Sequence, residues 1–167
     1  MTAAPFALDP LLAAVRDRST GIGSHVHCVQ HGRTVAANGL SLADSLAGVD
    51  TQVVFLFALL HDTMRENDST DPAHGRRAAG FARRLHAEYL LGVTGAQLER
   101  LAHACAEHAD GTVSADITVG ACWDADRLDL PRVGVTPRPD LFSTDVARGE
   151  TYRATTPADW LELYRRL

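Results

Sequence analysis

The chain has 167 residues, of which 46% are hydrophobic and 22% are charged, so we expect one globular domain over residues 1–167 rather than a disordered chain. The formal net charge of −5 argues against a protein that coats nucleic acid. All sixteen basic residues are arginines, which excludes Schiff-base chemistry on a lysine and leaves guanidinium groups to bind anions.

Three features of the sequence predict a cytoplasmic protein without a membrane segment. The N-terminus has no basic flank before an apolar stretch, and the longest apolar run, Val53–Leu60, is too short to cross a bilayer. Three scattered cysteines form no Cys-x-x-Cys pair, which argues against zinc fingers and thioredoxin-like sites and favours a reducing compartment.

Hydrophobic residues recur with helical rather than alternating spacing, which predicts an all-α fold of six to eight helices. Helix starts are indicated by Asp9-Pro10, by Asp50 or Thr51, and by Thr94. The predicted helices cover residues 9–18, 27–46, 71–91, 94–110 and 114–129. A further helix is predicted to begin at residue 51 and to end between residues 61 and 64, and a short last helix begins at Pro157.

The eight histidines can be sorted by helical phase. His27 and His31 are four residues apart and share an inward face, and His74 begins the apolar stripe of its helix. In the helix over 94–110, spacing from Leu101 places His108 on the buried face, whereas His103 falls on the polar face. A single inward histidine is more often a core residue that bonds to a carbonyl group than a metal ligand. Several inward histidines together favour a metal site.

Carboxylates accompany these imidazoles in apolar surroundings. His61 and Asp62 close an apolar helix, and a helix dipole would explain the histidine there but not the aspartate. Asp124 and Asp126 lie in a helix that is apolar nearly all round. Together these buried groups need a cation, and mixed nitrogen and oxygen ligands suit Fe, Mn, Co, Ni or Zn.

The order of these residues resembles the signature of the HD-domain superfamily of metal-dependent phosphohydrolases. The signature is a His, then a His-Asp pair, then a distal Asp, and it corresponds to His31 in HGRTVA, His61-Asp62 in LLHDTMREND and Asp126 in DADRLD. The resemblance spans about residues 24–130, with 131–167 in the same domain. It implies an HD-type helical bundle around a metal held by these four residues.

The resemblance also carries expectations beyond the first metal. Some members bind a second ion, for which His74 and His108 are suitable, with Asp62 as the bridge. Members of the nucleotidase type carry a glutamate where this chain has Arg65, and the Gly-Tyr-Pro motif of cyclic-di-GMP hydrolases is missing. The resemblance thus implies one or two metal ions, while these departures argue against an enzyme of the nucleotidase type and against cyclic-di-GMP as the substrate.

The leading interpretation is hydrolysis of a phosphoester of a small molecule or nucleotide by metal-activated water. Asp62, Arg65 and Asp68 are the expected catalytic residues, and Arg65, His27 and Arg127 are the expected substrate contacts. The alternative for Arg65 is a surface ion pair with Glu66 or Asp68.

Two other functions stay open. The same six metal ligands occur, in the same order, in the mixed-valent di-iron oxygenases of the inositol-oxygenase kind. A metal-stabilised accessory protein without turnover is the third interpretation. The amphipathic C-terminal segment, TPADWLELYRRL, predicts a helix that folds back on its own domain, or less often a homodimer contact.

Overall fold

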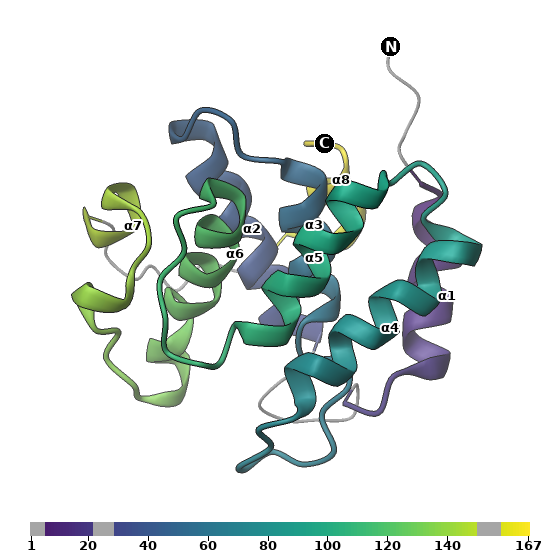
Figure 1. The fold of residues 1–167 in the computed structure, drawn as a ribbon, viewed down its shortest axis with the longest axis horizontal. Coiled ribbons are helices and arrows are strands. Elements are labelled where there is room, and N and C mark those ends of the chain that lie inside the picture. The colour runs from purple at the N-terminus through teal and green to yellow at the C-terminus, as the bar shows by residue number, and fades with distance from the viewer. Residues whose placement is uncertain (1–5, 22–28, 150–157) are drawn as a thin grey trace.

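The computed structural model describes residues 6–21, 29–149 and 158–167, and in these ranges it is entirely helical (Figure 1). The prediction of an all-α fold is confirmed. The described residues form eight α-helices and two short 3₁₀ helices: α1 (Leu8–Arg18), α2 (Val29–Ser45), α3 (Thr51–Leu60), α4 (His74–Tyr89), α5 (Gly95–Glu107), α6 (Ile117–Arg127), η1 (Leu130–Val133), η2 (Pro139–Leu141), α7 (Asp145–Gly149) and α8 (Trp160–Tyr164).

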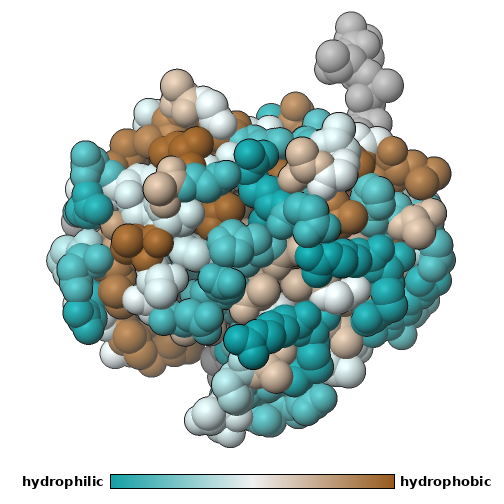
Figure 2. Space-filling view, viewed as in Figure 1, coloured by the Kyte–Doolittle hydropathy of each residue, from teal (hydrophilic) through white to brown (hydrophobic). Residues whose placement is uncertain are grey.

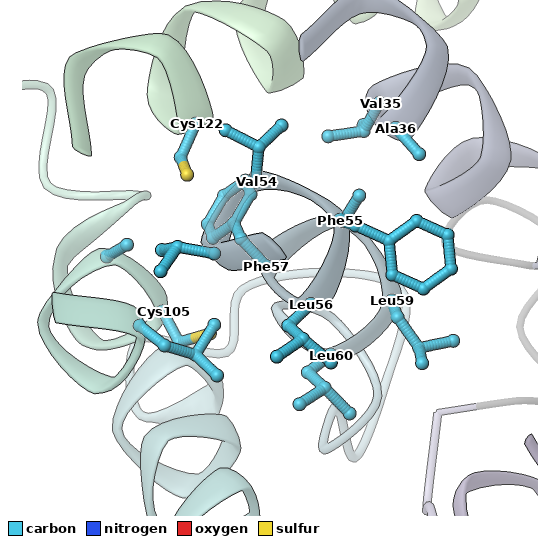
Figure 3. Packing of buried hydrophobic residues seen from close by; sticks show 14 of the residues in the cluster. Val35, Ala36, Val54, Phe55, Leu56, Phe57, Leu59, Leu60, Cys105 and Cys122 are labelled. Carbon is cyan, nitrogen blue, oxygen red and sulfur yellow. The ribbon is translucent and has the colours of Figure 1, made fainter. Parts of the chain in front are cut away.

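Helix α3 forms the centre of the bundle. Every residue from Val53 to Leu60 is buried, and a helix that is apolar all round must be enclosed on all sides. Its side chains point outward in several directions, toward α2 on one side and toward Cys105 of α5 and Cys122 of α6 on another (Figure 3). The helix begins at Thr51, and its cap is Asp50, one of the two predicted cap residues, whose carboxylate accepts hydrogen bonds from the backbone of the first turn.

Two pairs of consecutive helices make the most extensive contacts, α2 with α3 and α4 with α5. Each pair is joined by a short loop, so its helices run antiparallel. Helices α1 and α4 lie on one side of the molecule in Figure 1, and α6 and α7 on the other. The N-terminal end of one helix in each pair therefore lies beside the C-terminal end of its partner.

Helix α4 has one buried and one solvated face. Arg76, Arg83 and Arg84 are exposed, and hydrophilic residues cover much of the α4 side of the surface in Figure 2. Arg77 is half-buried and pairs with Asp71 at 2.5 Å. On the inner face, Gly75 lets α4 approach α5 closely.

Three predicted helix starts are displaced by a few residues. Helix α1 begins at Leu8, so Asp9 lies in its first turn and does not cap it. Helix α4 begins at His74 rather than Asp71, because the Asp71 carboxylate instead accepts a hydrogen bond from the backbone of Glu66. Helix α6 begins after Asp116, whose carboxylate caps it in place of the predicted Ser114.

The C-terminal helix α8 folds back on the core of its own chain, as the sequence predicted. Leu163 is buried, and the Trp160 ring lies edge-on to Phe55 of α3 with centroids 5.4 Å apart. Helix α8 starts at Trp160, and the predicted start at Pro157 lies outside the described residues, as does the predicted start of the second helix at His27. Every helix in the described ranges falls short of the length and hydrophobicity that a membrane span needs.

Candidate metal centre

Six buried or partly buried side chains gather where several helix ends meet. His31 lies in the first turn of α2 and His74 is the first residue of α4, while His61 and His108 cap the C-terminal ends of α3 and α5. Asp62 follows His61, and Asp126 lies in the last turn of α6. The antiparallel pairing of α2 with α3 and of α4 with α5 therefore brings residues that are far apart in sequence to one place.

The first cluster contains His31, His61, Asp126 and one oxygen of Asp62. The Nε2 atom of His31 lies 3.2 Å from His61 Nε2 and 3.2 Å from Asp126 Oδ1. Asp62 Oδ2 lies 3.8 Å from the Nε2 atoms of both imidazoles. Ligand atoms of His31, His61 and Asp62 thus lie close enough together to hold one metal ion.

The second cluster uses the other oxygen of Asp62. His74 Nε2 and His108 Nε2 lie 2.9 Å apart, and Asp62 Oδ1 lies 3.2 Å from the first and 3.5 Å from the second. Each cluster contains a buried group of ligand atoms close enough to share an ion. Asp62 faces both clusters with different oxygens, which is the arrangement of a carboxylate that bridges two ions.

Hydrogen bonds at the opposite ring nitrogen orient all four imidazoles. The Nδ1 atoms of His61, His74 and His108 lie 3.1, 2.5 and 2.8 Å from the carbonyl oxygens of Phe57, Asp71 and Cys105. A carbonyl oxygen only accepts, so each Nδ1 carries a hydrogen and Nε2 is the ring atom that each imidazole turns toward its cluster.

This arrangement of lone pairs calls for a cation. His74 and His108 present two Nε2 atoms at 2.9 Å, and two bare lone pairs at that separation repel each other. A proton or a metal ion between them removes the repulsion, and the nearby Asp62 carboxylate favours either positive charge. The donor set therefore fits a transition metal, the kind of ion that nitrogen and oxygen ligands of this mixture select.

His31 is oriented by a residue that the sequence reading missed. Its Nδ1 lies 2.7 Å from Asp129 Oδ2, and Arg132 Nε lies 2.6 Å from the same oxygen. Burial alone would lower the pKa of His31, but hydrogen bonds to the Asp126 and Asp129 carboxylates outweigh it and raise that pKa to about 9. The only signal in the sequence was the position of Asp129, one helical turn after Asp126.

The carboxylate of Asp126 shows the same electrostatic preference. Burial would raise its pKa, yet hydrogen bonds with His31 and His61 hold that pKa well below the usual range. A carboxylate that stays ionised beside two imidazoles is a ready ligand for a cation.

A cavity of about 330 Å³ opens onto both clusters, which is within the range of small-ligand sites. Its wall includes His31, Asp62, His108 and Asp126 together with four arginines: Arg65, Arg127, Arg132 and Arg138. A second cavity of about 370 Å³ adjoins His31, His61 and Asp62 and is lined mainly by apolar residues of α1 and α3 and by Trp160. Anionic and apolar parts of a ligand thus have separate surroundings near the same centre.

Arg65 lies directly beside the centre. Its Nε donates to Asp62 Oδ1 at 3.0 Å, so the alternative ion pair with Glu66 or Asp68 is not what the structure shows. Asp68 itself is exposed in the loop between α3 and α4 and is not part of the cavity wall. The structure therefore places Arg65 at the centre and Asp68 outside the cavity wall.

Arg127 differs from the expectation of a substrate contact. It is buried, and its guanidinium donates to the carbonyl oxygens of Leu141 and, at 2.6 Å, of Thr112. These bonds tie the segment before α6 to the segment after it. Because both terminal nitrogens are held by carbonyl groups, Arg127 supports the cavity wall. His27, another expected substrate contact, lies outside the described residues.

Two further predictions can be compared with the structure. His108 is buried and His103 is exposed, so the choice made by helical phase is confirmed. Asp124, the other unusual carboxylate of α6, lies away from the centre and accepts hydrogen bonds from the backbone of Ser143 and Thr144 and from the Thr144 hydroxyl. It joins α6 to the start of α7.

Comparison with known proteins adds one structural relative. No family model and no curated protein matches the sequence. The fold matches the crystal structure of a predicted HD superfamily hydrolase from an uncultured Thermotogales bacterium, with a TM-score of 0.65 and 26% identity over 84% of this chain and 80% of that one. This match and the convergence of the His, His-Asp and Asp side chains confirm the resemblance of the chain to the HD-domain superfamily.

Proposed function

We propose that the protein is a metal-dependent phosphohydrolase that cleaves a phosphoester of a small molecule or nucleotide. One observation carries the proposal: two clusters of metal-ligand atoms share Asp62 at the wall of a cavity that is also lined by arginines. The description of the structural relative as a predicted hydrolase agrees with this assignment.

Each residue of the centre has a role that follows from its contacts. His31, His61, Asp62 and Asp126 would hold one ion, and His74 and His108 would hold a second with the other oxygen of Asp62. Bound Fe, Mn, Co, Ni or Zn would supply Lewis-acid polarisation and a water of lowered pKa.

The chain's own cations would bind the phosphate. Arg65 and Arg132 lie close to the ligands, and Arg138 lies farther out on the same wall. A guanidinium group donates two parallel hydrogen bonds to a phosphate and neutralises charge that develops on it. The apolar cavity on the other side of His31 and His61 would accept an aromatic or aliphatic part of the substrate.

The test combines metal content with phosphate release. The protein would be purified without chelator, its metals quantified by elemental analysis, and phosphate release measured from a panel of nucleotides, sugar phosphates and aryl phosphates. Asp62→Ala should lose at least one metal equivalent and all metal-dependent phosphate release. The exposed Asp44 forms only a surface ion pair with Arg166, so Asp44→Ala is the matched control and should behave like the wild type.

A di-iron oxygenase is the second candidate, because all six residues of that ligand order converge at the centre. Two iron equivalents together with substrate-dependent uptake of dioxygen would favour the oxygenase. The arginines around the cavity favour the phosphohydrolase, since an uncharged polyol has no need of them. Metal without phosphate release or dioxygen uptake across the panel would leave the accessory-protein interpretation.

A further inference from the structure

Arg65 and the second cluster compete for one oxygen atom. Asp62 Oδ1 accepts a hydrogen bond from Arg65 Nε at 3.0 Å, and the same atom lies 3.2 Å from His74 Nε2 and 3.5 Å from His108 Nε2. The guanidinium therefore places a positive charge and a donor on the oxygen that a second ion would need. Both effects weaken binding of a cation there.

The first cluster is built differently. It combines two imidazoles and Asp126 with the other oxygen of Asp62, Oδ2, and the arginine contact at that end, Arg132, is made with Asp129 behind His31. The second cluster, as found among the described residues, consists of two imidazoles and the shared oxygen. The two sites therefore differ in ligand number and in local charge, and the second should bind metal more weakly.

Arg65 also has access to the ligand cavity. It is one of the residues of the cavity wall, and its Nη2 group has no partner among the described residues, while Nη1 makes only a long contact of 3.5 Å with the Ser69 carbonyl oxygen. A phosphate in the cavity carries more negative charge than one carboxylate oxygen and can accept two parallel hydrogen bonds from this guanidinium. A phosphate is thus the kind of ligand that can draw Arg65 away from Asp62.

We propose that Arg65 couples phosphate binding to occupancy of the second metal site. With an empty cavity Arg65 holds Asp62 Oδ1 and keeps the second site weak, and a bound phosphate takes over the guanidinium and frees the oxygen for the second ion. This inference rests on the proposed function. It adds that the enzyme assembles its complete binuclear centre only when a phosphorylated substrate is present.

The coupling has a reciprocal form that can be measured. If phosphate tightens the second site by some factor, the second ion must tighten phosphate binding by the same factor. A charge-assisted hydrogen bond of this kind corresponds to a change of about tenfold or more in affinity. We therefore expect phosphate to tighten the second site by about tenfold.

The experiment uses the whole chain, Mn²⁺ and inorganic phosphate. Equilibrium dialysis at fixed free Mn²⁺ gives the stoichiometry and the affinity of each site, and electron paramagnetic resonance separates an isolated ion from a carboxylate-bridged pair. Arg65→Gln removes the charge at the shared oxygen, and Arg65→Lys retains it. Arg83→Gln is the matched control, because it removes an exposed arginine that pairs with Glu99 and does not line the cavity.

The wild type should bind one Mn²⁺ tightly and a second weakly, and phosphate should tighten only the second. Arg65→Gln should bind the second ion about tenfold more tightly without phosphate and should lose the response to phosphate, whereas Arg83→Gln should keep that response. A second site that is unchanged in Arg65→Gln, or that still responds to phosphate, overturns the coupling. A single ion per chain even with phosphate also overturns the coupling, but it is still consistent with a mononuclear hydrolase. If neither site binds Mn²⁺, the proposed function itself is overturned.

Discussion

Asp129→Asn tests whether the hydrogen bond behind His31 tunes the first metal site. Asp129 is buried, and its Oδ2 lies 2.7 Å from His31 Nδ1. Asparagine has nearly the same shape and keeps an acceptor oxygen, so the fold should survive. The charge that strengthens His31 as a ligand is lost.

The magnitude has two parts. Removing such a partner of a metal-bound histidine typically lowers metal affinity by about 10- to 100-fold, or roughly 1.4 to 2.8 kcal/mol. In addition, Arg132 loses the carboxylate that it contacts at 2.6 Å, while its Nε stays 3.2 Å from His31 Nδ1. The guanidinium charge then opposes the ion with less compensation, so we expect a loss toward the upper end of that range.

The affinity would be measured by competition for Zn²⁺ between the protein and a chromophoric chelator. The double variant Asp129→Asn with Arg132→Gln should recover part of the lost affinity, because it removes the guanidinium charge beside His31. Asp140→Asn breaks only the exposed pair with Arg138 and serves as the control. A folded Asp129→Asn protein that binds Zn²⁺ within twofold of the wild type would refute the role given to Asp129.

Three further substitutions test the structure around the centre. A Cβ at Gly75 would lie 2.5 Å from the Cys105 carbonyl oxygen, so Gly75→Ala should push α4 away from α5. We expect this change to lower the free energy of unfolding by about 1–3 kcal/mol, measured by thermal unfolding, and to weaken the second metal site. Wild-type stability and metal content in that variant would contradict the close packing. Asp124→Ala leaves three donors of residues 143–144 without their acceptor. The free energy of unfolding should fall by about 3 kcal/mol, which calorimetry would detect as a fall of about 6–12 °C in Tm. An unchanged Tm would contradict this role of Asp124. Glu88→Gln breaks an exposed ion pair with Arg18 of α1 and should lower the free energy of unfolding, measured by urea denaturation, by less than about 1 kcal/mol. A larger loss would contradict the weak contribution expected of an exposed pair.

Local patterns in the sequence were sufficient for the helices and for the direction of many side chains. The apolar run of α3 and its cap at Asp50 are both found in the structure, because capping and hydrophobic periodicity act within one or two turns. Helical phase likewise separated the buried His108 from the exposed His103. The ordered His, His-Asp and Asp motifs, which are also local, indicated the superfamily that the structural match supports.

Contacts between distant segments could not be obtained in this way. The bond between His31 and Asp129 joins residues 98 positions apart, and nothing in either local sequence specifies it. Arg127 was expected to contact substrate, but tertiary packing turns it toward two carbonyl oxygens. The contact of Arg65 with Asp62 instead of its acidic neighbours in the following loop also depends on how that loop folds.

The sequence by itself thus determined the helical class, the inward-facing imidazoles and the residue types that bind a transition metal. Only the tertiary structure decided that Asp62 turns its two oxygens toward separate pairs of histidines and that Arg65 shares one of them. The physical reason is that helical phase fixes the direction of a side chain about its own axis. The distances between helices and the rotation of each one against its neighbours come from packing, as at the close approach of Gly75 to α5.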